Sequence, residues 1–396
     1  MSETEDPAVT LFREYLRIKT VQPDVNYDEA VEFLRRVAQD IGLEFTSFEV
    51  APQKPICIMT WKGTDPSLKS IVLSSHIDVV PVFPEHWKVD PFSAEKIDGK
   101  IYARGAQDMK CVGIQYLEAV RRLKNNGEQC LRNIHLIFTS DEEIGSVPQS
   151  LFVKREEFRK LNVGFALDEG IANPGEEFKV FYGEKSFWWV KVTCSGNPGH
   201  GSQLIENTAA EKVQRVINKF LEFRKTEEDR LKSDESLSIG SVCTVNMTML
   251  EGGIQYNVIP AELGIGFDIR IPPHVDMEKL EAQIAQWCKE SGEGVTYEFV
   301  VRGNHQDLTS IDDSDPWWNA FRGTCQNLDL KIITSICPVG TDSRHTRKLG
   351  IPALGFSPMN NTPVLLHDHN EFLHEKIFLR GIEIYQQIIP ALANVN

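Results

Sequence analysis

The chain has 396 residues, 41% of them hydrophobic and 25% charged, and its formal net charge is -15. That length fits roughly two domains, and no segment approaches the run of about 18 apolar residues that a membrane span requires. The excess of negative charge argues against a nucleic-acid backbone or an anionic membrane as the main partner, so we expect a globular protein that binds neither.

The N-terminus and the cysteines indicate the compartment. The first residues, Met1 to Pro7, are acidic and lack both the basic start and the apolar stretch of a secretory signal. Eight cysteines are scattered without a CxxC pair, so neither a disulfide framework nor a thiolate zinc site is indicated. We expect a cytoplasmic protein whose thiols are reduced.

The first 180 or so residues alternate short apolar strands with helical patterns, which indicates an α/β layer structure. Buried strands are predicted at 70–75, 134–139 and 163–167, and apolar residues recur at helical spacing from 109 to 123. Each candidate chemical group follows one of these strands. In open α/β sheets, ligands bind beyond the carboxyl ends of the strands, so this placement has a structural reason.

The pattern changes near residue 185, and the segment up to 301 reads strand, helix, strand, strand, helix, strand. Apolar and polar residues alternate at 243–249 and 263–269, as in half-buried antiparallel strands. Helical patterns at 209–221 and 280–288 would cover one face and give a ferredoxin-like layer. The mixed charges of 222–235 are typical of a solvated helix end or loop.

After residue 301 the chain returns to α/β character and closes with a helical segment near 377–389. We therefore predict a catalytic domain built from 1–184 and 302–396, interrupted by an inserted domain at 185–301. The fold class is α/β with an inserted α+β unit.

Two adjacent glutamates, Glu142 and Glu143, end the apolar run 134–139. One carboxylate can bind a divalent metal while its neighbour stays free as a proton acceptor, which is the division of labour in metal-assisted hydrolysis. His76 and Asp78 follow the strand at 70–75 and, two residues apart, would point the same way, so Asp78 could hydrogen-bond His76. Such a His-Asp pair is also common as a purely structural feature.

Further candidates follow other elements. Asp108 precedes the helical pattern and could simply be its N-cap, Glu169 ends the strand at 163–167, and a late polar segment contains His367 and His369. Together these groups form an oxygen-rich set without thiolates that suits two zinc ions. A structural magnesium or calcium site is the alternative, which the histidines disfavour.

The order of these motifs carries a family resemblance. The segments HIDVVP, ARGAQDMK, DEEIG, LDEG, PGHGS, YNVIP and LLHDH occur in the same order in the co-catalytic zinc hydrolases that include aminoacylases, glutamate carboxypeptidases and related peptidases. The chain resembles the aminoacylase members most, from about residue 8 to the last helix. The resemblance implies a mixed-sheet zinc-hydrolase catalytic domain with an inserted ferredoxin-like lid domain that mediates dimerisation.

The resemblance also implies roles for the acids and histidines. Glu142 would be the general base and Asp78 a catalytic residue beside the metals. The cofactor would be two Zn²⁺ per subunit, and His367 fits the family motif better than its neighbour His369. The implied ligands are His76 and Glu169 for one zinc, Glu143 and His367 for the other, and Asp108 as the bridge.

In the inserted domain, the resemblance implies that Asn257 and Arg270 bind the substrate. A free carboxylate needs a fixed cation, and Arg270 offers a bidentate fork; a surface ion pair with Asp268 is the less favoured alternative. His200 would polarise the scissile carbonyl, acting in the partner subunit of a homodimer. Without the resemblance, a glycine-flanked histidine is more often an exposed loop residue.

The activity that the resemblance implies is hydrolysis of N-acyl-L-amino acids, small molecules, to a carboxylate and a free L-amino acid. A dipeptidase or carboxypeptidase of the same family would use identical metal chemistry. A catalytically silent relative that works as a binding or scaffold protein is disfavoured, because all five implied ligands and the base are present.

Overall fold

A computed structural model describes residues 5–395, which divide into two compact units. One unit comprises residues up to 182 together with 308–334 and 341 onward. The other comprises 183–307 and the short segment 335–340, a segment that the sequence did not assign to the insert. Each unit has its own hydrophobic core, as expected of separately packed domains.

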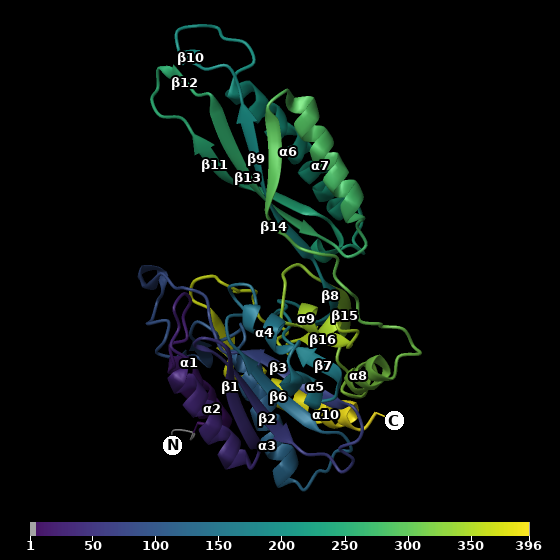
Figure 1. Cartoon of the computed structure of the whole chain (residues 1–396). Helices are drawn as coiled ribbons and strands as arrows, with labels where there is room; N and C mark the ends of the chain where they lie inside the picture. Colours follow the sequence, from purple (N-terminus) through teal and green to yellow (C-terminus); the bar gives the residue numbers. More distant parts are fainter. Residues whose placement is uncertain (1–4, 396) are drawn as a thin grey trace. The chain divides into compact units, whose positions relative to one another are not determined.

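The first unit is built on an eight-stranded mixed sheet (Figure 1). Parallel pairing joins β3 to β6 and β7, and β7 to β16, whereas β1, β2 and β8 pair antiparallel with their neighbours. The strands are, in sheet order, β1 (Glu44–Ala51), β2 (Lys54–Trp61), β6 (Ile134–Thr139), β3 (Ser70–His76), β7 (Val163–Asp168), β16 (Ala353–Phe356), β8 (Phe178–Glu184) and β15 (Ile332–Cys337). The three strands predicted before residue 170 are confirmed.

Helices cover both faces of this sheet, because its central strands are apolar on both sides. The main core lies under α1 (Pro7–Arg17), α2 (Asp28–Ile41), α3 (Lys110–Asn125), α8 (Pro316–Asn327) and α10 (Glu375–Ala393). A smaller core on the other face involves α4 (Val147–Phe152) and α5 (Glu156–Lys160), and α9 (Ser343–Arg347) contacts β7 and β16. A small sheet joins β17 (Phe372–His374), β5 (Lys100–Tyr102) and β4 (Glu95–Ile97).

Helix α3 lies unusually close to the strands that carry the candidate site. A Cβ at Gly113 would lie 2.8 Å from Ser75 Oγ and 2.9 Å from Phe138 Cε1, so only glycine fits there without a shift of its neighbours. The helix predicted at 109–123 is confirmed, beginning one residue after Met109. Its close approach places Asp108, two residues before the helix, near the end of β3, where Asp108 contacts His76.

The second unit confirms the ferredoxin-like prediction. Its four-stranded antiparallel sheet has the order β11-β13-β9-β14, and α6 and α7 pack on one face (Figure 1). Two short strands, β10 and β12, pair beyond this sheet. The elements are β9 (Ser186–Ser195), β10 (Gly199–His200), α6 (Ala209–Ser233), β11 (Thr244–Gly252), β12 (Val258–Ile259), β13 (Glu262–Ile271), α7 (Met277–Ser291) and β14 (Val295–Arg302).

The helix predicted at 209–221 extends to Ser233 and takes in most of the charged run 222–235. Ion pairs one turn apart, Lys225 with Asp229 and Lys232 with Glu228, support this solvated extension. A capping box of Thr208 and Glu211 begins the helix. The charged run is therefore a helix end, one of the two forms expected.

Candidate metal centre

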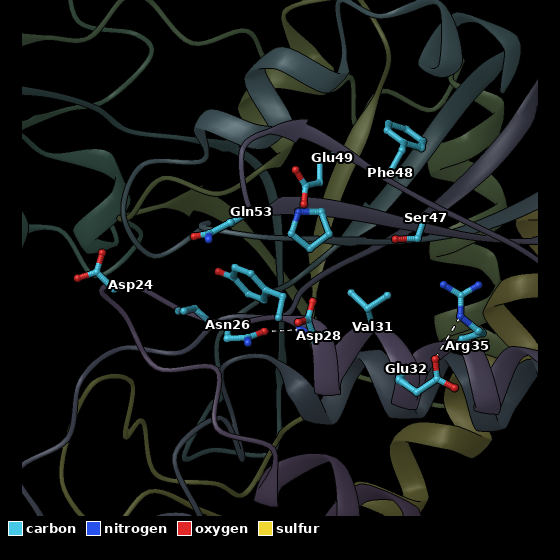
Figure 2. Close-up of a pocket in the computed structure, with 13 residues that line it drawn as sticks. Asp24, Asn26, Asp28, Val31, Glu32, Arg35, Ser47, Phe48, Glu49 and Gln53 are labelled. Carbon is cyan, nitrogen blue, oxygen red and sulfur yellow. Dashed lines mark hydrogen bonds and ion pairs between the residues drawn. The ribbon is translucent and has the colours of Figure 1, made fainter.

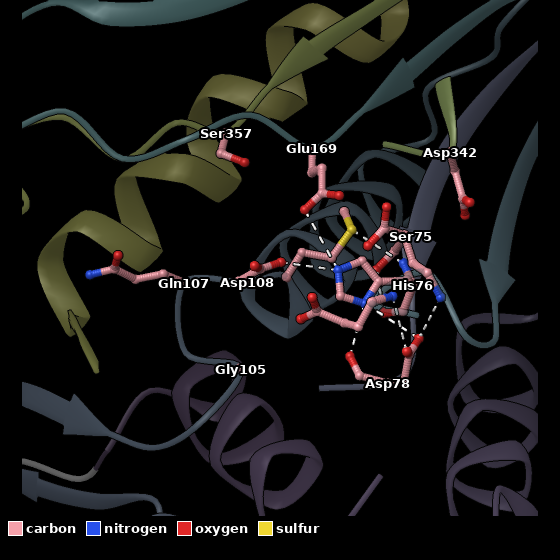
Figure 3. A network of polar contacts seen from close by, with 12 residues as sticks. Ser75, His76, Asp78, Gly105, Gln107, Asp108, Glu169, Asp342 and Ser357 are labelled. Atoms are coloured by element: carbon pink, nitrogen blue, oxygen red, sulfur yellow. Dashed lines mark hydrogen bonds and ion pairs between the residues drawn. The ribbon is translucent and has the colours of Figure 1, made fainter. Parts of the chain in front are cut away.

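The candidate residues of the first unit gather at the carboxyl ends of the parallel strands. His76 ends β3, the glutamate pair follows β6, and Glu169 follows β7. In Figure 3 the side chains of Asp108 and Glu169 converge on the ring of His76. Parallel neighbours end at the same edge of a sheet, which is why residues far apart in the sequence meet here.

The first group of possible ligands consists of His76, Asp108 and Glu169. His76 Nε2 lies 3.0 Å from Asp108 Oδ1 and 3.6 Å from Glu169 Oε2. All three side chains are buried. Nδ1 of His76 is 2.8 Å from the main-chain carbonyl of Asp78, which leaves Nε2 to face the two carboxylates.

A second group shares Asp108 and adds Glu143 and His367. His367 Nε2 lies 3.0 Å from Glu143 Oε2 and 3.4 Å from Asp108 Oδ2. Because Asp108 turns Oδ1 toward the first group and Oδ2 toward the second, one carboxylate belongs to both. This is the arrangement of a bridging ligand between two metal ions.

His369, the rival for His367, belongs to neither group within residues 5–395. Its ring instead lies against His86, with ring centroids 4.8 Å apart, and edge-on to Phe83. The geometry therefore favours His367 as the ligand over His369.

Asp78 contacts the glutamate pair through its carboxylate. Oδ1 accepts the main-chain N–H of Glu142 at 3.1 Å, and Oδ2 accepts that of Glu143 at 3.2 Å and Nε2 of Gln22 at 2.8 Å. The expected hydrogen bond from His76 to this carboxylate is replaced by the one to the Asp78 carbonyl, since Oδ1 is 3.7 Å from Nδ1. Asp78 thus orients the backbone of both glutamates.

Glu142 is buried beside the two ligand groups without belonging to either. Ser146 Oγ lies 3.5 Å from its Oε1. Burial and the charge of nearby Glu169 raise the pKa of Glu142 well above its usual range. A carboxylate with a raised pKa and weak hydrogen bonding can accept a proton and later release it.

Neighbouring carboxylates also raise the pKa of both histidines. Hydrogen bonds to Asp108 and Glu143 raise the pKa of His367 to about 10. Burial alone would lower the pKa of His76, but the carboxylates of Glu169 and Asp108 raise it well above its usual range. The site therefore attracts positive charge, and without metal its histidines hold protons that a metal would displace.

These residues fit a pair of divalent metal ions. Glu143 Oε1 is buried, and no donor in the part of the chain that the structure describes reaches it. A buried, unpaired carboxylate oxygen among further carboxylates is costly unless a cation meets it. Two imidazoles and three carboxylates are suitable ligands for two zinc ions or similar transition metals.

The substrate residues expected in the second unit lie on two of its strands and a loop. His200, in β10, is exposed, and its Nδ1 is 2.8 Å from Ser202 Oγ. Asn257 precedes β12, and its carbonyl accepts Gly201 N–H. Arg270, in β13, forms a bidentate pair with Asp268, so the ion pair considered from the sequence is present.

Sequence reasoning missed a buried polar cluster behind the glutamate pair. Asp141 Oδ1 accepts Tyr27 Oη at 2.6 Å and Gln22 Nε2 at 2.9 Å, and its Oδ2 lies 2.6 Å from Lys54 Nζ. Through Gln22, which also donates to Asp78, this cluster connects the N-terminal segment to the turn that carries both glutamates. The only available signal was that Asp141 is adjacent to them.

A separate cavity of about 750 Å³ lies between the start of α2 and the β1–β2 turn (Figure 2). Its charged lining consists of four acids and Arg35, which is paired to Glu32. None of the candidate metal ligands lines it. The cavity is therefore not part of the metal centre.

The fold and the ligand groups define a metal-dependent hydrolase, and comparison with known proteins identifies the family. The family model for Peptidase family M20/M25/M40 matches residues 72–391. Aminoacylase-1A of Rattus norvegicus is 56% identical over 395 residues, covering 99% of this chain and 97% of that protein. Aminoacylase-1 of Homo sapiens is 55% identical with the same coverage, and that of Dictyostelium discoideum is 45% identical over 99% of both chains. The chain belongs to the M20 family, whose members hydrolyse amide bonds.

Solved structures show the same fold at low sequence identity. An M20 family metallo-carboxypeptidase from Sulfolobus solfataricus matches with a TM-score of 0.76 and 17% identity, covering 98% of this chain and 100% of that one. Human carnosine dipeptidase 1 matches with a TM-score of 0.71 and 17% identity, covering 98% and 96%. A dinuclear metal-binding M20 peptidase from Bacillus subtilis matches with a TM-score of 0.68 and 15% identity, covering 98% of each chain.

Within residues 5–395, no helix is both long enough and apolar enough to cross a membrane.

The raised pKa of His367 predicts how the metal-free protein responds to pH. Its folded pKa of about 10 lies above the unfolded value near 6.5, so its contribution to stability is complete below pH 6.5 and is lost as the pH rises toward 10. Urea unfolding of metal-stripped wild type and His367→Gln should therefore give a free-energy difference that shrinks between pH 7.5 and 10.

The matched control is His135→Gln. Burial lowers the pKa of His135 to about 4, so this side chain is neutral in the folded and unfolded states across that pH window. Its substitution should cost the same stability at pH 7.5 and pH 10. A His367→Gln effect that is equally independent of pH would contradict the charged pairing with Asp108 and Glu143.

Proposed function

We propose that the protein is a zinc-dependent hydrolase that converts N-acyl-L-amino acids to a carboxylate and a free L-amino acid. The observation that carries this proposal is the full-length identity, 55–56%, to mammalian aminoacylase-1 proteins. The dipeptidase and carboxypeptidase relatives share the fold at 17% identity, so they support the architecture more than the substrate. Among the described residues, none of the eight buried cysteines forms a disulfide, which favours the proposed cytoplasmic location.

The proposed cofactor is two Zn²⁺ per subunit. His76 and Glu169 would hold one ion, Glu143 and His367 the other, and Asp108 would bridge them, in keeping with the two ligand groups. Bound zinc supplies Lewis acidity, which lowers the pKa of water and stabilises negative charge on a carbonyl oxygen.

In this proposal Glu142 moves the proton. Its carboxylate accepts a proton from the attacking water and then returns it to the nitrogen of the leaving amino acid. Glu142 is buried and lies outside both groups of possible ligands within residues 5–395, so its carboxylate is available for this transfer. The Asp78 carboxylate accepts hydrogen bonds from the main-chain N–H groups of Glu142 and Glu143. These bonds fix the backbone of both residues, so that Glu143 can bind metal while Glu142 transfers the proton.

The division of labour between the two glutamates gives a paired test. Glu142→Gln should retain two metal ions by elemental analysis yet lose about 100- to 10,000-fold in kcat, since only the proton transfer is removed. Glu143→Gln should instead lower the metal content, because it removes a ligand of one ion. Substantial turnover by metal-replete Glu142→Gln protein would refute the role of this base.

Arg270 is the proposed anchor for the substrate carboxylate; Asn257, the other proposed substrate residue, precedes β12 and lies toward the opposite end of β13. Asp268 receives Nε and one terminal nitrogen of Arg270 at 2.7 and 3.0 Å, and the guanidinium also lies 5.2 Å from the ring centre of Phe187. These contacts orient the guanidinium and leave its other terminal nitrogen, Nη1, for an incoming carboxylate. The ion pair with Asp268 is then a support for the binding residue.

A substitution at Arg270 separates carboxylate recognition from general damage. Arg270→Lys should raise KM for N-acetyl-L-methionine about 10- to 100-fold, because the charged hydrogen bond from Nη1 to the substrate carboxylate and the paired contacts that orient the guanidinium are lost. Hydrolysis of N-acetyl-L-methioninamide, which lacks the carboxylate, should be unaffected. Arg302→Lys, an arginine paired with Glu281 in the same unit, is the control. Faster wild-type turnover of dipeptides than of N-acetyl-L-methionine would favour the dipeptidase alternative.

We also propose a homodimer formed through the inserted domain, with His200 acting in the partner's site. The loops next to β10 and β12 expose three large apolar side chains almost completely, Leu204, Ile254 and Tyr256. Clustered apolar side chains this exposed are typical of surfaces that another chain covers. Because β10 pairs with β12, these loops lie beside His200.

Hybrid dimers test whether the sites are shared. Neither His200→Ala nor Glu142→Gln should be active alone, but a mixture allowed to exchange subunits should regain activity, since each hybrid has one complete site. Exchange is verified by native mass spectrometry with two tags of different mass. Absence of activity in verified hybrids would place His200 in its own subunit's site or outside the mechanism.

A further inference from the structure

A fully buried carboxylate, Glu371, organises the loop that carries Asp108. Its Oε2 accepts Arg104 Nη1 at 2.8 Å and Gly105 N–H at 3.2 Å, and its Oε1 accepts Gln107 N–H at 2.6 Å and Asp108 N–H at 3.3 Å. Glu371 is 0% exposed and belongs to neither group of metal ligands within residues 5–395. One side chain therefore accepts three of the backbone N–H groups in the loop just before α3.

The same loop is tied back to the segment that contains His367. Arg104 Nη1 also donates to the carbonyl of Asp368 at 3.1 Å. Gln107 Nε2 donates to the carbonyl of Phe372 at 2.8 Å, and its Oε1 accepts Leu365 N–H at 3.1 Å. These bonds join two segments more than 250 residues apart in the sequence. Asp108 and His367 are thus held by one buried polar cluster.

All four contacts of the Glu371 carboxylate are hydrogen bonds that it accepts, so its two oxygens supply the acceptors for this loop. An apolar side chain at this position would leave the N–H groups of residues 105, 107 and 108 without their acceptor. Gly105 has φ +89°, and a Cβ there would lie 3.0 Å from Val79 Cγ1, so the path of the loop at this point requires glycine. The loop is held in a single path by this one acceptor.

We propose that Glu371 is a positioning residue for the metal centre, fixing the bridging carboxylate of Asp108 and the imidazole of His367 relative to each other. This inference rests on the proposed function, in that those two residues are taken as ligands. It extends that proposal, because it makes metal binding depend on a residue that would contact neither metal nor substrate.

Glu371→Gln tests the inference, because it preserves shape but replaces one acceptor oxygen with an N–H donor. Zinc affinity, measured by competition with a chromophoric chelator, should weaken about 10- to 100-fold, the usual effect of losing a residue that orients metal ligands. At saturating zinc, KM for N-acetyl-L-methionine should be unchanged while kcat falls, since the substrate contacts remain.

The matched control is Glu227→Gln, another buried carboxylate, which accepts the main-chain N–H of Cys243 at 2.6 Å in the second unit. It should lower thermal stability without changing zinc affinity. If Glu371→Gln fails to fold, Arg104→Lys removes the bridge to Asp368 while keeping a positive charge, and it should weaken zinc binding in the same direction.

The two proposals fail in different ways. Wild type that binds no pair of zinc ions would overturn the proposed function itself. Wild type that binds two ions, with Glu371→Gln or Arg104→Lys proteins of unchanged zinc affinity but reduced melting temperature, would show that Glu371 serves stability alone and would overturn the present inference.

Discussion

Repulsion among buried carboxylates is the constraint on which the centre depends. The strand ends bring Asp108, Glu142, Glu143 and Glu169 together away from water. Only cations can make such a cluster stable in its charged form, and two histidines supply part of that charge when they are protonated. Hydrogen bonds within the surrounding loops hold these acids in place against their mutual repulsion.

Two further buried acids stabilise these loops by accepting hydrogen bonds from backbone N–H groups. Asp78 accepts the amides of the adjacent glutamates, and Glu371 accepts those before Asp108. In both cases a negative side chain orients a loop whose own acid then faces the site. These hydrogen bonds fix the backbone that carries the ligand carboxylates. The carboxylates can then bind a metal ion without rearrangement of the loops, which is the advantage of a preorganised site.

The sequence predicted the parts of this arrangement that depend on local pattern. Strands β3, β6 and β7 are apolar runs whose polar successors must meet at one edge, so His76, the glutamate pair and Glu169 could be expected to lie together. The assignment of ligands, including Asp108 and His367, came from the family resemblance. The contacts of Gln22 and Glu371 could not, because they connect segments 119 and more than 260 residues apart along the chain. Such contacts depend on loop paths that only tertiary packing decides.

The order of strands in the large sheet has a consequence for how the chain is made. Strand β16 lies between β7 and β8, yet it is the last of the eight to be synthesised, after the whole of 183–307. The whole inserted unit must therefore be synthesised before β16 and α10 can complete the first unit. Until then the apolar edge of β7 is open, and the nascent chain is most prone to aggregation during that interval.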